Sequence, residues 1–399
     1  MDEPEIVVVD CLVIGAGPAG SVAAREVAKD GWKVLLIEKR PEVGVPVRCG
    51  EGISKSLLNR LGLEKDPRFV DSEMDGALIH SPGGHEIILG PEIAGPEVGF
   101  VIRREYFDQH LAAEAVSAGA ELWVRAEAMG MKKVPEGYEV DVEHIMGRKL
   151  AKARIVVAAD GFESKVARWA GMDTSLKVGD IDTCLQYEMV GVECDRRYTE
   201  FFVGKKYAPG GYVWCFPKGP DIANIGIGLN GAMIKKPAEV KTYLDKFIRE
   251  NGRFSKGTIT EINGGGVSVS LPLEEMTADN FIVVGDAARM IDPLTGGGIY
   301  NACIGALHAG AAVSRALKNA DCSGEMLRSF ETEWRKELEE EMARNYMAKE
   351  KLLSISDETL DKIISSVADY DLKDISTEEL LKAVISKHPE IMEDLEDLL

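Results

Sequence analysis

Residues 6–20 read IVVVDCLVIGAGPAG, and this stretch decides the fold. Residues 6–14 are mostly β-branched and apolar, a pattern typical of a central parallel strand that is buried on both faces. Gly15, Gly17 and Gly20 then follow with the spacing GxGxxG. We therefore expect a buried strand that ends in a glycine turn, at the point where a helix begins.

The next residues complete a strand–helix–strand unit. Residues 19–29 contain good helix formers and stop at Asp30-Gly31, and residues 33–37 form a second strand that ends in Glu38. A bare GxGxxG also fits an ordinary turn, but in this context it predicts a dinucleotide site. Gly15 would allow the tight turn, Gly17 the approach of a pyrophosphate and Gly20 close helix packing, while Glu38 would accept from a ribose hydroxyl.

Further segments predict a mixed α/β protein (α+β overall). Residues 153–161 (ARIVVAADG) and 281–288 (FIVVGDAA) predict more strands of the parallel sheet, whereas alternating stretches between 175 and 270 predict antiparallel strands. Helices are expected at residues 104–118, 299–318 and 329–353, and small helices after them. We expect a discontinuous dinucleotide-binding domain, an antiparallel substrate domain and a helical region. Their ranges are 1–80, 100–172 and 272–328 for the first, 81–99 and 173–271 for the second, and 329–399 for the third.

Composition excludes several function classes. The net charge of −20 disfavours wide contact with nucleic acid or with an anionic membrane surface. The seven cysteines form no CxxC pair and indicate free thiols in a reducing cytoplasm, and no metal-ligand cluster is visible. The acidic start and the lack of about 18 uninterrupted apolar residues indicate a cytoplasmic protein, with membrane contact at most peripheral.

Three later motifs bear on the ligand. Asp160-Gly161 and Gly285-Asp286 each end a predicted strand, where an Asp can accept from a ligand hydroxyl. Arg104 opens a helix and is another candidate contact. Gly297 and Gly298 precede the helix that starts at Ile299, so its amides could stabilise an anionic ring, although a glycine-rich helix entry can also serve packing alone.

An aromatic strand supplies the candidate substrate wall. Tyr212, Trp214 and Phe216 alternate with Val213 and Cys215, so the three aromatic side chains should project from one face. Alternation alone favours a sheet-to-sheet core. Lys218 could contact an anionic headgroup, or it could simply be solvated.

On these motifs the chain resembles the p-hydroxybenzoate-hydroxylase-like flavoproteins. The segments PVRCGEG (46–52), YVWCFPKG (212–219) and DPLTGGGIYNA (292–302) make it similar to the archaeal geranylgeranyl reductases in particular. The resemblance implies bound FAD and a lipid pocket lined by the aromatic strand. It implies cofactor contacts at Gly15, Gly17, Ala19, Gly20, Glu38, Lys39, Cys49, Gly50, Gly52, Arg104, Ala128, Asp160, Asp286, Gly297, Gly298 and Ile299.

The resemblance also implies an activity, the saturation of geranylgeranyl double bonds on archaeal diether glycerophospholipids. Cys49 is then a candidate proton donor, since an ordinary thiol is protonated at neutral pH, but it can equally be a small space-filling residue. Arg48 and Glu51 could position substrate or flavin. The electron donor is NADPH or a ferredoxin-type carrier protein, because no second glycine fingerprint is visible.

Two alternatives stay open from the sequence. One is a flavin monooxygenase or halogenase, because the fold serves both and halogenases carry a similar aromatic segment. The other is a non-catalytic prenyl-binding protein similar to escort proteins of the same ancestry. A flavin absorbance in the purified protein would argue against the second alternative, and alkene saturation without oxygen would argue against the first.

Overall fold

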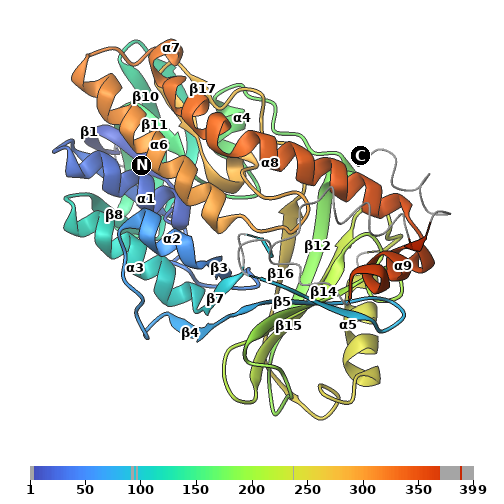
Figure 1. Ribbon diagram of the computed structural model, residues 1–399. Helices are drawn as coiled ribbons and strands as arrows, with labels where there is room; N and C mark the ends of the chain where they lie inside the picture. Colours follow the sequence, from blue (N-terminus) through green and yellow to red (C-terminus); the bar gives the residue numbers. More distant parts are fainter. Residues whose placement is uncertain (1–3, 91–93, 96–97, 237, 369–386, 389–399) are drawn as a thin grey trace. The chain divides into compact units, whose positions relative to one another are not determined.

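The computed structural model describes residues 4–90, 94–95, 98–236, 238–368 and 387–388 of the chain (Figure 1). Most of the helical region predicted after residue 368 therefore lies outside the described residues. The chain divides into two compact units. Unit 1 comprises Met1–Val47, Arg104–Leu176 and Ser268–Arg344, and unit 2 comprises Arg48–Arg103, Lys177–Val267 and Asn345–Leu399.

Unit 1 is built on an eight-stranded sheet. Strand β1 pairs in parallel with β2 and β11, and β8 and β18 continue the parallel sheet beyond them. The strand–turn–helix–strand prediction near the amino terminus is confirmed. The strands are β1 (Glu5–Ile14), β2 (Val34–Glu38), β8 (Glu121–Val124), β9 (Ala126–Val134), β10 (Gly137–His144), β11 (Gly147–Ala158), β17 (Thr277–Ala278) and β18 (Phe281–Val283).

Helices of unit 1 pack closely because small residues lie where they meet. Helix α1 contacts α3 and α6, and a Cβ at Gly310 of α6 would lie 2.4 Å from the Cβ of Glu26 on α1. The helix predicted at 299–318 is confirmed. The helices are α1 (Pro18–Lys29), α3 (Arg104–Ser117), α4 (Lys165–Trp169), α6 (Ile299–Lys318), α7 (Gly324–Leu327) and α8 (Ser329–Ser354), the last of which continues into unit 2.

Unit 2 contains a seven-stranded sheet in the order β16-β12-β15-β14-β13-β5-β6 and a three-stranded sheet in the order β3-β7-β4. The predicted antiparallel pairing holds along β12, β15, β14 and β13, and β13 then pairs in parallel with β5. The strands are β3 (Gly52–Ser54), β4 (Val70–Glu73), β5 (Gly76–His80), β6 (Glu86–Leu89), β7 (Gly99–Ile102), β12 (Ile181–Val190), β13 (Tyr198–Val203), β14 (Tyr212–Pro217), β15 (Ile222–Asn230) and β16 (Thr258–Ser268).

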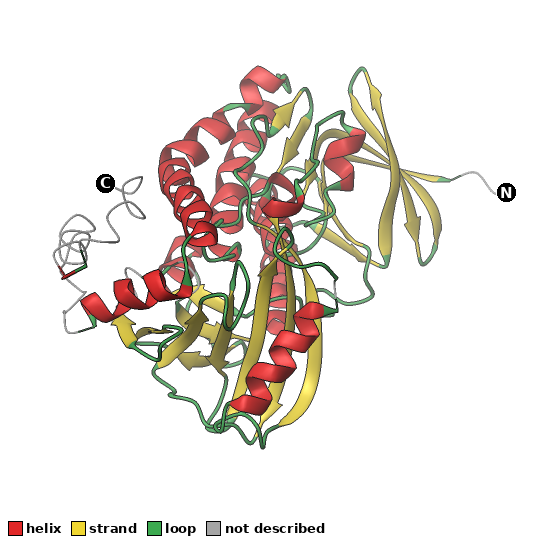
Figure 2. Cartoon of the chain, turned by 90° about the vertical axis from the view of Figure 1, so that its right-hand side faces the viewer, coloured by secondary structure: helices red, strands yellow, loops and turns green. Residues whose placement is uncertain are grey.

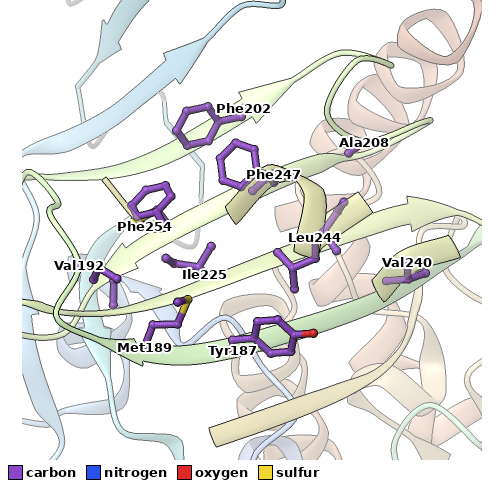
Figure 3. Close-up of a cluster of buried hydrophobic side chains, with 14 of the residues drawn as sticks. Tyr187, Met189, Val192, Phe202, Ala208, Ile225, Val240, Leu244, Phe247 and Phe254 are labelled. Carbon is purple, nitrogen blue, oxygen red and sulfur yellow. The ribbon is translucent and has the colours of Figure 1, made fainter. Parts of the chain in front are cut away.

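The two faces of the seven-stranded sheet carry different side chains. On one face, helix α5 (Glu239–Glu250) lies along the long strands (Figure 2) and closes an apolar core that includes Leu244, Phe247 and Ile225 (Figure 3). Val213 and Cys215 of β14 point into this core. The remaining helices of unit 2 are α2 (Lys55–Leu61) and α9 (Asp357–Val367). The residues of β14 that alternate with Val213 and Cys215 therefore lie on the opposite face of the sheet.

One predicted strand is shorter than expected. Residues 281–288 form β18 only as far as Val283, and Gly285–Ala288 turn into a 3-10 helix. Gly285 has a φ of 66°, which ends the extended conformation at that point. Asp286 thus leaves the sheet at the carboxyl end of a parallel strand, where ligands bind in sheets of this kind.

Candidate functional site

The three glycines of the turn after β1 differ in the space that a side chain would find at each position. Gly15 has a φ of 105°, and a Cβ there would lie 2.2 Å from the carbonyl oxygen of Ala159. A Cβ at Gly20 would lie 1.8 Å from the carbonyl oxygen of Gly15, so no larger residue fits. A Cβ at Gly17 would meet no atom of the described chain within 4 Å. The backbone of Gly17 is therefore open to a ligand at the start of α1, which fits a pyrophosphate.

Glu38 lies beside this turn at the end of β2. Its carboxylate accepts hydrogen bonds from the backbone nitrogens of Ala16 at 3.1 Å and Arg40 at 2.9 Å. These bonds fix the carboxylate at the edge of the glycine turn, the position that the ribose-acceptor prediction requires. Ala19 is buried in the first turn of α1, whereas Lys39 is exposed.

Asp160 lies against the same turn, since its backbone nitrogen is 3.3 Å from the position of a Gly15 Cβ. One carboxylate oxygen, Oδ2, accepts from the backbone of Val166 at 3.0 Å, while Oδ1 is buried without a partner among the described residues. Burial raises the pKa of Asp160, against the backbone hydrogen bonds and the charge of Lys39. A buried acceptor with an unused oxygen beside a nucleotide turn is consistent with a bound ligand in this region.

Asp286 and Arg104 form a second part of the candidate cofactor site. Asp286 is exposed, yet protein surrounds its carboxyl closely enough for desolvation to raise its pKa, with the charge of Arg104 opposing the shift. Arg104 opens α3 and binds both oxygens of Asp108 at 2.8 Å, which holds its guanidinium in place.

The glycines before α6 bring the amides of that helix next to Asp286. A Cβ at Gly298 would lie 3.3 Å from Oδ1 of Asp286 and 3.0 Å from Ile291, so only glycine fits comfortably. The first N–H of α6 that bonds back along the helix is that of Ala302, which donates to Gly298 at 2.9 Å. Within the described residues no side chain caps this end, so the earlier amides, that of Ile299 included, are available to an anionic group.

These groups fit FAD, because all of them belong to unit 1 and combine an open phosphate turn, a ribose acceptor and a second free helix terminus. Ala128, the remaining unit 1 prediction, is half-buried on β9 opposite Val142. The contacts of each residue with the cofactor stay predictions. Cys49, Gly50 and Gly52 belong to unit 2 and are described with it.

The aromatic alternation predicted for β14 is confirmed. Trp214 and Phe216 are buried on the face opposite α5, and the half-buried Tyr212 packs with them. The buried rings belong to a core cluster that also contains Met74, Ala77, Val98 and Val101, so the core interpretation holds for Trp214 and Phe216, and the lining of a lipid pocket stays a prediction. Phe201 of β13 contacts Tyr212 and Phe216 edge to face, with ring centroids 5.3 and 5.5 Å away. We name Tyr212, Trp214, Phe216 and Phe201 the aromatic face.

A glycine in β15 lets Trp214 lie flat across the sheet. Gly226 is the register partner of Trp214, and a Cβ there would lie 2.2 Å from the indole ring. The ring therefore crosses over β15 to reach β12, where its nitrogen donates to the side-chain oxygen of Gln186 at 2.8 Å. Gly228, the next residue on this face, would hold a Cβ at 3.4 Å from Cys184, an ordinary contact.

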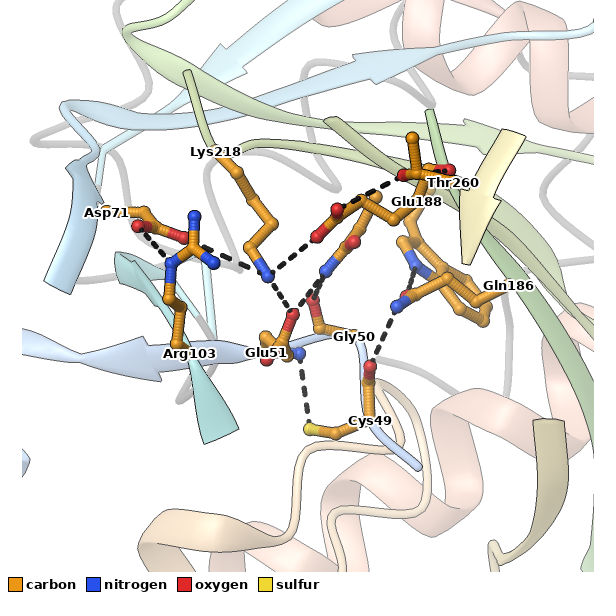
Figure 4. A network of polar contacts seen from close by, with 11 residues as sticks. Cys49, Gly50, Glu51, Asp71, Arg103, Gln186, Glu188, Lys218 and Thr260 are labelled. Carbon is orange, nitrogen blue, oxygen red and sulfur yellow. Dashed lines mark hydrogen bonds and ion pairs between the residues drawn. The ribbon is translucent and has the colours of Figure 1, made fainter. Parts of the chain in front are cut away.

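The turn at residues 49–51 is attached to this same face of the sheet (Figure 4). Gln186 donates its side-chain nitrogen to the carbonyl oxygen of Cys49 at 3.0 Å, and Asn224 donates to that of Gly50 at 3.2 Å. A Cβ at Gly50 would lie 3.1 Å from Phe216, so the turn lies directly against the aromatic face. The structure thus brings together two predicted motifs that are far apart in the sequence. Gly52 is buried at the start of β3.

The structure contradicts one of the two interpretations of Lys218. It is only 8% exposed, so the interpretation that it is solvated is wrong. Its ammonium lies 2.6 Å from Glu51, 3.2 Å from Glu188 and 3.8 Å from Asp71 (Figure 4). Burial alone would lower the pKa of Lys218, but these carboxylates outweigh it and raise the pKa. The charge of Lys218 is therefore already met within the chain, and its contact with a lipid headgroup stays a prediction.

The sequence motifs do not indicate several residues of this network. Gln186 and Asn224 hold the Cys49 turn, and Gly226 makes room for Trp214. A usable signal existed in β15, which reads NIGIGLN from Asn224 to Asn230. Its alternate residues on one face are Asn, Gly, Gly and Asn, which is an unusual surface for a buried strand because two positions carry no side chain.

Two kinds of feature are absent from the described residues. No group of three or more His, Cys, Asp or Glu side chains is arranged to hold a metal ion. No helix in the described ranges has both the length and the apolar content needed to span a membrane.

Two family models match this chain. Residues 8–208 match a family described as FAD binding domain, and residues 180–267 match one described as geranylgeranyl reductase catalytic domain. The second match covers β12 to β16 almost entirely, including the aromatic strand.

Individual proteins agree with these models. A digeranylgeranylglycerophospholipid reductase of Thermoplasma volcanium is 45% identical over 393 residues, which cover 98% of this chain and 99% of that protein. A crystal structure of a geranylgeranyl bacteriochlorophyll reductase-like protein from Thermoplasma acidophilum is 44% identical with a TM-score of 0.92, covering 99% of this chain and 100% of that one. A p-nitrophenol 4-monooxygenase of Pseudomonas putida, at 16% identity, TM-score 0.74 and 98% coverage of both chains, shows the fold alone.

The resemblance stated from the motifs is thereby confirmed over nearly the whole length. On these matches, the chain belongs to the digeranylgeranylglycerophospholipid reductase family of FAD-binding flavoproteins.

Proposed function

We propose that this chain is an FAD-dependent reductase that saturates the geranylgeranyl double bonds of digeranylgeranylglycerophospholipid. The observation that carries the proposal is the aromatic face, which lies within the segment that matches the geranylgeranyl reductase catalytic domain. Unit 1 supplies the nucleotide turn and unit 2 supplies an apolar surface, which are the two elements that such a reaction needs.

Unit 1 would hold FAD through backbone groups and acids. The open backbone of Gly17 and the first amides of α1 would face the pyrophosphate, and Glu38 would accept from the adenosine ribose. Asp286 would accept from a ribitol hydroxyl, while the amides that begin α6 near Gly298 would face the electron-rich end of the ring. Reduced FAD, when bound, would supply a hydride to one carbon of the alkene.

Unit 2 would orient the lipid chain. An isolated alkene has no carbonyl that a protein could polarise, so catalysis depends on positioning and on the exclusion of water. The half-buried ring of Tyr212 would offer apolar surface to a prenyl chain, and the buried rings of Trp214 and Phe201 that pack against it would hold it in place. Cys49 would give its Sγ proton to the second alkene carbon, so that each saturation adds one hydride and one proton.

For the electron donor we propose two candidates. NADPH could reduce the cofactor in a transient complex, or a ferredoxin-type carrier protein could transfer electrons singly. Stopped-flow reduction of the purified flavoprotein with NADPH, and separately with reduced ferredoxin, distinguishes the two donors.

Because the substrate is a membrane lipid, we also propose that a cytoplasmic enzyme meets the membrane peripherally.

An anaerobic turnover assay tests the activity. The purified protein is reduced with dithionite and incubated with digeranylgeranylglycerophospholipid, and lipid mass spectrometry follows the gain of two hydrogens per saturated bond. Turnover that requires oxygen, without saturation, would identify a monooxygenase or halogenase instead. A colourless protein that binds the lipid without changing it would support a prenyl-binding function.

A further inference from the structure

Cys49 receives a hydrogen bond from its own turn. The backbone N–H of Glu51 donates to Sγ of Cys49 at 3.2 Å. A donor on sulfur favours the thiolate over the thiol, because it stabilises the charged form. Proton donation from Cys49 leaves a thiolate, so this N–H stabilises the group that remains after the proton has been transferred.

The turn that carries this N–H also holds Glu51 in an uncommon backbone conformation. Its φ is 75°, a region that glycine occupies easily and that Glu adopts only at a cost in energy. Gly50 precedes it and Gly52 follows it, so a glycine at position 51 would have been simpler for the turn alone. The side chain of Glu51 must therefore contribute something that compensates for the strain.

That contribution is a buried set of contacts on the carboxylate. Glu51 is 2% exposed, and its Oε2 accepts from Lys218 at 2.6 Å and from Asn224 at 2.7 Å. Its carbonyl oxygen accepts from the backbone of Ile102 at 2.8 Å. These contacts come from β15, from the end of β7 and from the residue after β14, so three separate segments fix the side chain and carbonyl of Glu51.

Lys218 also offsets the negative charge of the carboxylates near Cys49. A carboxylate two residues from Cys49 would disfavour a thiolate, as would the more distant Glu188 and Asp71. The Lys218 ammonium lies against all three, and Arg103 donates to Asp71 at 2.9 Å. Arg48 adds a further positive charge next to Cys49 in the sequence. The negative charges near the turn are thus largely offset by cations.

We propose that Glu51 is a positioning residue. Lys218 and Asn224 hold its carboxylate, so that its backbone N–H stabilises the Cys49 thiolate. The proposal rests on the proposed function, in which Cys49 donates a proton. In that step the S–H bond breaks, a C–H bond forms at the alkene carbon, and water later returns the proton to Sγ. The side chain of Glu51 acts on the backbone and touches neither lipid nor cofactor in this account.

Two substitutions at one position separate the backbone effect from the loss of charge. Glu51→Gly and Glu51→Ala both remove the carboxylate, but only glycine adopts a positive φ without strain. Full-length protein is treated with iodoacetamide at neutral pH, and mass spectrometry follows each cysteine peptide. We expect Cys49 to react about tenfold faster in the glycine variant, the value of about one charge-assisted hydrogen bond. Cys322, in unit 1, should react equally in both variants.

Equal Cys49 rates in the two folded variants would overturn the proposal. Protection of the buried Cys215 reports that each variant is folded. If Glu51→Ala does not fold, Glu51→Asn replaces it, because Asn adopts positive φ less readily than Gly, and the glycine variant must still react faster.

The reductase assay supplies a second readout. Relative to Glu51→Gly, the alanine variant should lose about tenfold in kcat with KM changed by less than about twofold, because only the proton-transfer step is affected. A loss confined to KM would contradict the proposal. If the unsubstituted protein does not reduce the lipid at all, the proposed function fails, while the iodoacetamide rates still test the positioning of Cys49.

Discussion

The indole nitrogen of Trp214 donates a hydrogen bond to Gln186 over 2.8 Å, and the other end of the same amide donates to the carbonyl oxygen of Cys49 over 3.0 Å. Gln186 is only 2% exposed, so water cannot replace either bond easily. One buried amide therefore connects the aromatic face to the turn that carries Cys49.

Replacing Gln186 by Leu should destabilise the protein by about 2–4 kcal/mol, because the buried indole N–H of Trp214 and the part-buried carbonyl oxygen of Cys49 both lose their partner. Chemical denaturation followed by tryptophan fluorescence measures the loss. Gln109→Leu is the matched control, since Gln109 bonds at the surface of unit 1 to Glu42 and Val43 and should cost less than about 0.5 kcal/mol. Equal costs at the two positions would show that the Gln186 bridge adds no stability.

Replacing Gly226 by Ala should displace Trp214, because the new Cβ would lie 2.2 Å from the ring. We expect a loss of about 1–3 kcal/mol in the free energy of unfolding, as for other overpacked sites, and lower lipid turnover. Gly228→Ala, on the same strand and face, places its Cβ at 3.4 Å from Cys184 and should be tolerated. Denaturation and the anaerobic assay are run on both variants, and the prediction fails if Gly228→Ala is the more damaging.

Replacing Gly17 by Ala should weaken FAD binding at least tenfold while the fold persists. The Cβ meets no described atom of the chain, so it obstructs only a ligand that approaches the backbone. Flavin absorbance of the purified protein and titration of the apoprotein with FAD measure the effect. Gly20→Ala is the contrasting variant, since its Cβ would lie 1.8 Å from the Gly15 carbonyl and should destabilise the apoprotein itself. Unchanged FAD affinity in Gly17→Ala would place the pyrophosphate elsewhere.

Asp182 should make the stability of the protein depend on pH. Burial raises its pKa from 3.8 to about 6, against the hydrogen bond from Asn230 and the charge of Lys349. Between these values the folded state binds more protons than the unfolded state, so stability is greatest below the lower value and falls as the pH rises through about 6. Asp182→Asn should therefore raise the free energy of unfolding by about 1–2 kcal/mol at alkaline pH and change it little at acidic pH.

Denaturation curves at several pH values test this dependence. Asp180→Asn serves as the comparison, because Asp180 pairs with the buried Lys349 and its loss should destabilise the protein near neutral pH. A gain in stability from Asp182→Asn that is independent of pH would point to a cause other than ionisation.

Local patterns explain why much of the fold could be predicted. The nucleotide turn, α1 and β2 follow from residues that are adjacent in the chain, and the start of α6 follows from Gly298. The common face of Tyr212, Trp214 and Phe216 follows from the two-residue period of a strand. Each of these predictions depends on geometry within one element or between neighbours in sequence.

The contacts of Lys218 could not be predicted in the same way. Its carboxylate partners come from β12, β4 and the turn before β3, and only the folded sheet brings them together. Gln186 and Asn224 were missed for the same reason, because a buried amide is recognised by its partners and not by its neighbours in sequence. A lysine after a proline looks solvated until those partners are known.

The interleaving of the two units limits how new substrate ranges can arise. Each unit combines three separated stretches of the chain, so unit 2 cannot be exchanged between relatives as one continuous segment. A recombination event with one crossover would split both cores. Changes in lipid preference are therefore expected to accumulate as point substitutions on the sheet face, and protein engineers would do better to vary Phe201, Tyr212 and Gly228 than to swap domains.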